Sequence, residues 1–222
     1  MSETMHKPFI IIGAGGHAKV VADLLLEMGE EVLGLTDADP ARQKHDVLGL
    51  PVLGDDSVLQ RFAPDSVNLA LGIGAAGKDL CAALMARYGV GKKLQALGYG
   101  FPALIHLDAI VGRGCMIDDG AQVMAGAVVQ ADSHIGSFAI VNSRASIDHD
   151  GRVFQAAHIA PGAVLGGGVA VGEGAYIGIG AALVHGISIG AGALVGAGAA
   201  VTNDVADGVR VVGVPAREMN VC

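Results

Sequence analysis

The chain has 222 residues and a formal net charge of −8, from 22 acidic and 14 basic side chains. No run of lysine and arginine forms the basic patch that a nucleic acid backbone requires, so the composition argues against nucleic acid binding. Hydrophobic residues make up 52% of the chain but aromatic residues only 4%, and 35 residues are glycine, which predicts a core of small and β-branched side chains.

Signals for export or membrane insertion are missing from the sequence. The opening stretch "MSETMHKPFIII" has no basic region followed by a long apolar one. No stretch reaches the roughly 18–20 unbroken apolar residues of a membrane span. The cysteines, Cys81, Cys115 and Cys222, are odd in number and scattered. That usage fits a reducing compartment, so we expect a cytoplasmic protein without a membrane span.

The first 104 residues predict an α/β unit. Continuous apolar runs indicate strands buried in a parallel sheet, and apolar residues at helical spacing indicate the helices between them. In chain order, the sequence predicts a strand at 9–12, a helix around 20–28, and strands at 32–35 and 67–74, followed by a helix at 78–88. Together they form a βαβαβ unit, which is half of a doubly wound fold.

From residue 105 the sequence follows a period of six. Every sixth residue from Ile105 to Val201 is aliphatic, seventeen in succession, and the residue four places after each is usually small. Neither a helix, with a period of 3.6, nor a simple strand, with a period of 2, explains this pattern. It predicts a three-sided solenoid in residues 105–222 whose short strands each turn one aliphatic side chain inward.

The glycine turn "GAGGHA" at 13–18 lies between the first strand and the first helix. Gly15 and Gly16 would let the backbone approach a phosphate at the helix N-terminus, and Asp37, some twenty residues on, would take ribose hydroxyls. His17 either lines the sugar–phosphate or is a partly exposed cap residue. A dinucleotide needs a second half-fold that is missing before residue 105, so a single nucleotide is favoured over NAD and over a plain tight turn.

Two histidines stand out within the bland repeats. In "SIDHDGRVFQAAHIAPGA", His149 should face outward from the solenoid, and His158 lies nine residues further on, half a coil away. Within one subunit they should therefore lie on different faces, so a site using both would lie between subunits. Columns of triangular cross-section pack naturally as cyclic trimers, which predicts a homotrimer.

The repeats resemble those of the hexapeptide-repeat acyltransferases, which wind as a left-handed parallel β-helix. The order of motifs, from the nucleotide-binding half-domain through "VNSRASIDHD" and "HIAPGAVLGG" to "GVPARE", is similar to that of sugar acetyltransferases. These bacterial enzymes make diacetamido sugars or GDP-N-acetylperosamine, and their relatives O-acetylate sialic acid. The resemblance implies acetyl-CoA-dependent N-acetylation of a nucleotide-linked 4-amino-4,6-dideoxy sugar by a trimer.

The resemblance also implies roles for individual residues. His149 matches the catalytic base and Asp150 the carboxylate that supports it, with Asp148 as a rival for that support. The expected acetyl-CoA contacts, whose glycines let pantetheine approach the backbone, are His158, Gly178, Ile179, Gly196 and Ala197. The nucleotide is expected at Gly15, Gly16, His17, Asp37 and the "LGIG" loop with Gly72 and Ile73.

The chemistry is consistent with a histidine base, because imidazole titrates near the pH at which a sugar amine must lose its proton. O-acetylation of a sugar such as sialic acid is the nearest alternative, and an NAD-dependent oxidoreductase is a more distant one. A zinc site like that of γ-class carbonic anhydrases needs three histidines. His149 and His185 are two coils apart, but no third histidine falls beside them, so no metal is expected.

Overall fold

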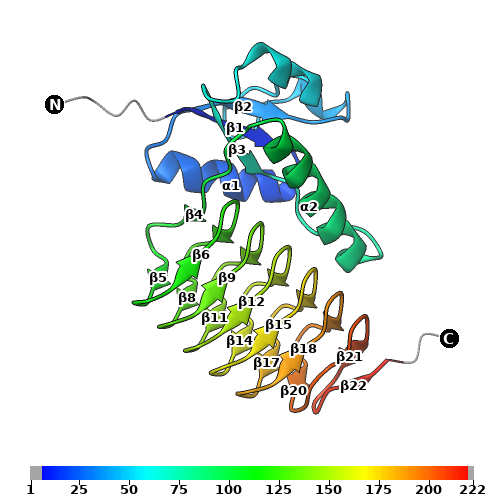
Figure 1. Ribbon diagram of the computed structural model, residues 1–222. Coiled ribbons are helices and arrows are strands. Elements are labelled where there is room, and N and C mark those ends of the chain that lie inside the picture. The colour runs from blue at the N-terminus through cyan, green and yellow to red at the C-terminus, as the bar shows by residue number, and fades with distance from the viewer. Residues whose placement is uncertain (1–6, 220–222) are drawn as a thin grey trace. The chain divides into compact units, whose positions relative to one another are not determined.

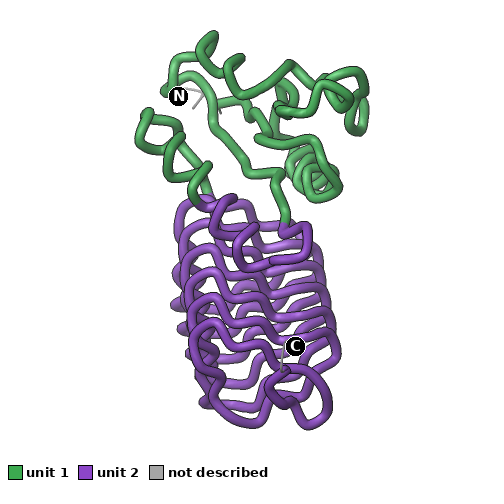
Figure 2. Tube along the Cα trace, turned by 90° about the vertical axis from the view of Figure 1, so that its right-hand side faces the viewer, with its two compact units in different colours: residues 1–74, 89–102 green, residues 75–88, 103–222 purple. Residues whose placement is uncertain are grey.

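The computed structural model describes residues 7–219. The chain divides into two compact units, the first containing residues 1–74 and 89–102 and the second residues 75–88 and 103–222 (Figure 2). Cys81 and Cys115 are free thiols, whereas Cys222 and the first six residues of the chain lie outside the described range. No helix within residues 7–219 is long and apolar enough to cross a membrane.

The first unit is built on a parallel three-stranded sheet of β1 (Phe9–Ile12), β2 (Val32–Thr36) and β3 (Asn68–Leu71), in the order β2-β1-β3 (Figure 1). Helix α1 (Gly16–Glu27) joins β1 to β2. Between β2 and β3 the chain forms two 3-10 helices, Arg42–Lys44 and Asp56–Arg61, in place of an α-helix. This arrangement confirms the predicted strand–turn–helix–strand start.

The central strand of this sheet, β1, is buried on both faces. All four side chains of β1 are at most 4% exposed, as expected where both faces of a parallel sheet are covered. Helix α1 buries Val21, Leu24 and Leu25 but leaves Val20 42% exposed, so its apolar stripe is narrower than its spacing predicted. Helix α2 (Leu80–Ala96) extends eight residues beyond the predicted end, and its residues 80–88 belong to the second unit.

The second unit is a column of short parallel strands, each two or three residues long, with turns between them (Figure 1). The strands are β4 (Leu104–Ile105), β5 (Ile110–Val111), β6 (Met116–Ile117), β7 (Gln122–Val123), β8 (Val128–Val129), β9 (His134–Ile135), β10 (Ile140–Val141), β11 (Ser146–Ile147), β12 (Arg152–Val153), β13 (His158–Ile159), β14 (Val164–Leu165), β15 (Ala170–Val171), β16 (Tyr176–Ile177), β17 (Ala182–Leu183), β18 (Ser188–Ile189), β19 (Leu194–Val195), β20 (Ala200–Val201), β21 (Arg210–Val212) and β22 (Arg217–Glu218).

The strands form three sheets, with eight, six and five strands, which are the three faces of the column. Along the column a strand pairs with the one three places further on, so that Ile140 lies opposite His158 and Val141 opposite Ile159. One coil therefore takes eighteen residues, as the period of six predicted. The C-terminal end departs from this order, since β19 pairs with β21, and β22 runs antiparallel to β21.

The interior of the column confirms the repeat. A single core cluster contains the aliphatic residues from Val123 to Val201 together with small residues such as Ala145 and Ala163. Ile105 and Ile117 are only partly buried against this cluster, and Val111 is 36% exposed. These three side chains belong to the first coil, which has a following coil of this unit but no preceding one.

The turns follow the same period, with a residue of positive φ every six positions from 114 to 198. Glycine occupies most of these positions because it adopts this conformation without a steric penalty. Five successive turns break the rule, with φ between 57° and 59°, at Asp132, Phe138, Arg144, Asp150 and Ala156. Residues other than glycine rarely adopt a positive φ, and those that do are concentrated at functional sites. We therefore expect a site near these five turns.

Candidate active site

Two rows of turns flank the six-stranded face. The row we call the 149 edge joins the six-stranded to the five-stranded face, with turns at residues 130–133, 148–151, 166–169 and 184–187. The row we call the 179 edge joins the eight-stranded to the six-stranded face, with turns at 142–145, 160–163, 178–181 and 196–199. The residues expected to catalyse lie on the first edge, and most of those expected to bind CoA lie on the second.

His149 and Asp150 form a close pair on the 149 edge. The Nδ1 atom of His149 is 2.7 Å from Oδ2 of Asp150, and both side chains are about two-thirds exposed. The left-handed backbone at Asp150, with φ at 59°, lets its short carboxylate reach back to the preceding ring. Nδ1–H donates in this arrangement, which leaves the lone pair of Nε2 free to accept a proton.

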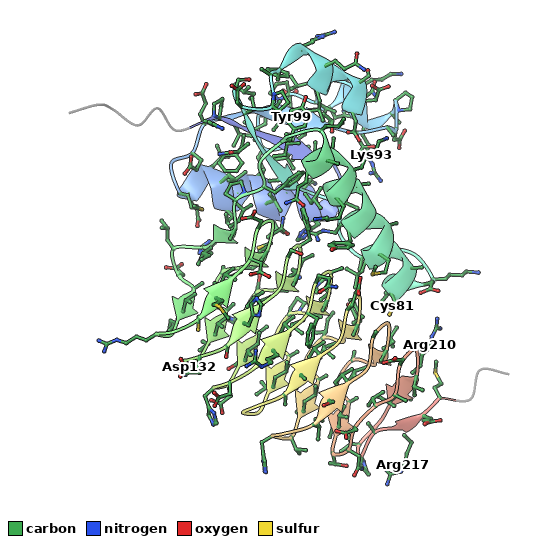
Figure 3. The ribbon with its side chains drawn as sticks, viewed as in Figure 1. Cys81, Lys93, Tyr99, Asp132, Arg210 and Arg217 are labelled. Carbon is green, nitrogen blue, oxygen red and sulfur yellow. The ribbon has the colours of Figure 1, made fainter. Side chains whose placement is uncertain are left out.

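Asp148 holds the same turn in a different way. Its Oδ1 atom accepts a hydrogen bond from the backbone N–H of His149 at 2.8 Å. The pKa of His149 is raised above its usual value, mainly by the hydrogen bond from its ring to Asp150 and then by the negative charge of Asp148. Asp132, labelled in Figure 3, occupies the equivalent of position 150 one coil earlier on this edge.

Gly167 lies next to the ring of His149. A Cβ atom built on Gly167 would be 2.5 Å from Nε2 and 2.7 Å from Cε1 of that ring. The two positions are one coil apart, and the backbone N–H of Gly168 donates to the carbonyl of His149 at 2.8 Å. The absence of a side chain at Gly167 is therefore what allows the imidazole to lie against the column.

His158 is 7% exposed, in contrast to His149, and lies on the eight-stranded face. Its Nε2 atom is 3.1 Å from Nδ2 of Asn142, which begins a turn on the 179 edge. Because an amide nitrogen only donates, Nε2 is the acceptor and the ring proton is on Nδ1. The ring also makes an edge contact with Tyr176 one coil further on, with centroids 5.1 Å apart.

The other expected CoA residues gather on the 179 edge. Ile179 is 58% exposed although it is aliphatic, and Ala197 occupies the equivalent place one coil further on. Gly178 lies beneath that coil, since a Cβ on it would be 2.6 Å from the Ala197 nitrogen. A Cβ on Gly196 would be 2.7 Å from Cγ1 of Val212. Both glycines are thus required by close stacking of the coils, and Ile179 and Ala197 are the exposed residues that follow them in the chain.

In the first unit, Asp37 ties the glycine turn together. It is 8% exposed, and its Oδ2 accepts from the Ala14 N–H at 2.8 Å and from Arg42 Nη1 at 3.1 Å. Its Oδ1 accepts from the Asp39 N–H at 2.9 Å. Burial alone would raise the pKa of Asp37, but the hydrogen bonds from Asp39, Ala14 and Arg42 outweigh it and lower the pKa.

The other residues expected to bind the nucleotide surround the same turn. Gly15 is the N-cap of α1 and Gly16 its first residue, and the first turn has no acidic side chain and no side-chain cap. The loop after β3 packs closely here, because a Cβ on Gly72 would be 2.7 Å from the Ala18 Cβ. Ile73 lies against Gly13 and His17 against Gly74 in the same way. The structure therefore brings these predicted residues together.

Three residues at these sites were missed by sequence reasoning. Gly167 and Asn142 lie in turns that the six-residue period locates, but their partners depend on the stacking of coils. Arg42 follows Asp37 within five residues, yet no motif includes it.

Among residues 7–219, no three His, Cys, Asp or Glu side chains come together as a metal site, and His134 pairs with Asp118 at 3.0 Å.

Known proteins resemble this chain over nearly its whole length. Residues 8–77 match the PglD N-terminal domain family. Among solved structures, a histidine variant of perosamine N-acetyltransferase from Caulobacter crescentus, in complex with CoA and GDP-perosamine, is 40% identical with a TM-score of 0.88, covering 96% of this chain and 97% of that chain. No curated protein sequence matches the chain.

Two further structures have the same architecture. The acetyltransferase domain of PglB from Neisseria gonorrhoeae, in complex with acetyl coenzyme A, is 36% identical with a TM-score of 0.87, covering 96% of this chain and 100% of that chain. WeeI from Acinetobacter baumannii is 25% identical with a TM-score of 0.85 over the same shares. The column and its edges define an acyltransferase of the hexapeptide-repeat class. Within that class, the chain belongs to the amino-sugar acetyltransferases that include perosamine N-acetyltransferase and the PglB domain.

Proposed function

We propose that this protein transfers the acetyl group of acetyl-CoA to the amino group of a nucleotide-linked 4-amino-4,6-dideoxy sugar. The observation that carries the proposal is the His149–Asp150 pair at 2.7 Å, with Nε2 lying beside Gly167. Similarity to an enzyme solved with CoA and GDP-perosamine supports this substrate class. GDP-perosamine is accordingly the first substrate to test.

In the proposed reaction His149 is the general base. The sugar amine attacks the thioester carbonyl while Nε2 of His149 takes a proton from the nitrogen, and Asp150 stabilises the resulting imidazolium. The tetrahedral intermediate then collapses, the C–S bond breaks, and the imidazolium returns the proton to the CoA sulfur. No serine or cysteine nucleophile takes part, because the amine attacks directly.

The negative oxygen of the tetrahedral intermediate requires a hydrogen-bond donor close to Nε2. Among the described residues, the backbone N–H of Gly167 has no acceptor, and this residue adjoins the Nε2 atom. We assign this N–H as the donor to the oxyanion. The imidazole would then remove the proton from the attacking nitrogen, which becomes positive, while the amide stabilises the carbonyl oxygen, which becomes negative.

Acetyl-CoA is proposed to bind along the 179 edge. Ile179 and Ala197 are exposed small or aliphatic residues at equivalent places on successive coils of this edge, which suits contact with the narrow pantetheine chain, and Gly178 and Gly196 let these coils stack closely. His158 would meet the acetyl end, and Asn142 positions its ring. Residues 1–104 are proposed to bind the nucleotide through Gly15, Gly16, His17, Asp37, Gly72 and Ile73.

The two edges are proposed to meet between subunits of a homotrimer. The outward residues of the six-stranded face carry no charge, and Ile110 and Val164 on it are 62% and 51% exposed. The five-stranded face instead presents His134 and Arg152. An apolar face on a column favours association, and the 149 and 179 edges border it on its two sides. With this face at a threefold axis, one subunit's 149 edge would adjoin the next subunit's 179 edge.

The proposal places the enzyme in the cytoplasm, where acetyl-CoA and nucleotide sugars are made. It is tested by incubating the protein with acetyl-CoA and GDP-perosamine and measuring free CoA with a thiol reagent. Products are then identified by mass spectrometry. Release of CoA together with an N-acetylated sugar supports the proposal, and no CoA release from any of the GDP-, UDP-, CDP- and dTDP-linked 4-amino sugars contradicts it.

O-acetylation is tested in the same assay. A GDP-linked sugar with a hydroxyl group in place of the 4-amino group differs only in the attacking atom. A hydroxyl is a weaker nucleophile than a neutral amine, so we expect a site suited to the amine to acetylate the hydroxyl sugar more slowly. A faster reaction with sialic acid or with the hydroxyl sugar would favour the O-acetyltransferase alternative.

A further inference from the structure

We propose that Arg42 binds the diphosphate of the nucleotide sugar and that Asp37 is the residue that positions it. This inference rests on the proposed function, because it names a further contact within the same nucleotide site. Arg42 belongs to no motif in the sequence. Its assignment depends on where the structure places its guanidinium.

The guanidinium of Arg42 is fixed beside the glycine turn. Its Nη1 atom donates to Oδ2 of Asp37 at 3.1 Å, and its Nε lies 3.8 Å from Oδ2 of Asp39. A Cβ atom on Gly15 would be 3.6 Å from Nη1. The charged end of the side chain therefore lies against the residue that caps the N-terminus of α1.

Arg42 retains donors for a ligand. Its side chain is 53% exposed, whereas that of Asp37 is 9% exposed. A guanidinium has five N–H donors in a planar fork, and Asp37 takes one of them. Asp39 is beyond hydrogen-bond distance. The exposed side chain can therefore offer its remaining donors to a ligand, and the first turn of α1 has no acidic side chain that would repel a phosphate.

This arrangement suits a diphosphate better than a ribose. Arginine forms bidentate, charge-assisted hydrogen bonds with phosphate oxygens. Asp37, by contrast, already accepts hydrogen bonds on both oxygens from Ala14, Arg42 and Asp39. We therefore infer that Asp37 acts by holding the turn and the arginine in place, which is a different role from the ribose contact that its sequence position suggested.

The chain provides a matched control for Arg42. Lys44 belongs to the same 3-10 helix and is exposed, so Arg42→Gln and Lys44→Gln remove the same charge from the same short element. The Arg42 substitution also removes the contacts of the guanidinium with Asp37 and Gly15. Comparing the two variants therefore separates the effect of losing a positive charge from the effect of losing these contacts. Arg42→Lys retains the charge but removes the fork.

The test is calorimetric titration of the four proteins with GDP, UDP, CDP and dTDP, followed by the monophosphate and the nucleoside of the base that the wild type prefers. For Arg42→Gln we expect diphosphate affinity to fall about ten-fold, in line with loss of a charge-assisted hydrogen bond, and nucleoside affinity to change less than about two-fold. Lys44→Gln should bind like the wild type, and Arg42→Lys should be intermediate. In steady-state kinetics the KM for the nucleotide sugar rises in Arg42→Gln, while the KM for acetyl-CoA does not.

The outcomes separate the two proposals. If the wild type binds a diphosphate and Arg42→Gln binds it equally well, the role of Arg42 is wrong and the proposed function stands. Equal losses for diphosphate and nucleoside would also overturn the role, because they indicate a damaged unit. If the wild type binds none of the four diphosphates, the nucleotide-linked substrate itself is contradicted.

Discussion

The imidazole of His149 lies over Gly167 of the next coil, so close that a Cβ on that glycine would be 2.5 Å from Nε2. The φ angle of Gly167 is not in the left-handed region, so alanine fits the backbone there. Gly167→Ala should therefore displace the ring with little cost in stability. We expect kcat to fall at least about ten-fold, as when a base loses its geometry, with an unchanged KM for acetyl-CoA.

Gly192→Ala is the control for this substitution. Gly192 has a φ of 62°, and a Cβ added there would have no neighbouring atom within 4 Å, so alanine is strained at this position without touching another residue. It should lower the melting temperature and leave kcat unchanged. A Gly167→Ala enzyme with wild-type kcat would show that the ring does not need its place over the glycine.

The pH dependence should separate Asp150 from Asp148. A base works only when neutral, so activity rises with pH through the pKa of His149, and a raised pKa places that rise at higher pH. Because the hydrogen bond to Asp150 is the largest cause of the raised pKa, Asp150→Asn should move the acidic limb of the kcat profile to lower pH and reduce the maximum. Asp148→Asn should shift the limb less. A larger shift in Asp148→Asn would transfer the supporting role to that residue.

The apolar six-stranded face should control assembly. Val164 lies on it and is 51% exposed, so Val164→Glu places a charge in the proposed interface. We expect light scattering after gel filtration to show monomers in place of trimers, and activity to be lost with the fold retained by circular dichroism. Met116→Glu, on the five-stranded face and 56% exposed in the subunit, is the control and should remain trimeric. A fully active monomer would contradict the shared site.

The core of the column should be sensitive to cavities. Ile159 is 0% exposed and lies between the coils of Val141 and Ile177. Ile159→Ala should destabilise the column by about 2–4 kcal/mol, measured by urea denaturation. Met116→Ala removes an exposed side chain and should cost less than about 0.5 kcal/mol. Equal effects would mean that the aliphatic row does not form the core.

Much of this architecture could be predicted because a period of six fits stacked three-sided coils, and neither a helix nor a simple strand. The aliphatic row from Ile105 to Val201 and its small companions identify the inward positions directly. The end of α2 could not be predicted, since Gly89 and Gly91 weaken the helical pattern after Tyr88. Buried Leu84 and Leu94 show that packing overrides the low helix propensity of these two glycines.

The candidate site was predictable only in part. The position of His149 follows from the repeat, and its pairing with Asp150 was expected by resemblance. The left-handed turn that brings a short carboxylate to the ring could not be recognised from Asp150 itself, because glycine is the residue that usually signals this conformation. Contacts between coils, such as Gly167 with His149, join residues eighteen apart and become visible only once the stacking is known. The partners of Asp37 depend in the same way on how the chain folds after β2.

The most direct test of the account compares the wild type with His149→Ala, using acetyl-CoA and the nucleotide-linked amino sugar that the wild type accepts. General base catalysis typically contributes about 10²–10⁴-fold, so we predict that kcat falls at least about a hundred-fold while calorimetry shows CoA binding with unchanged affinity. A variant that binds CoA and retains a kcat close to that of the wild type would contradict the assignment of His149 as the base.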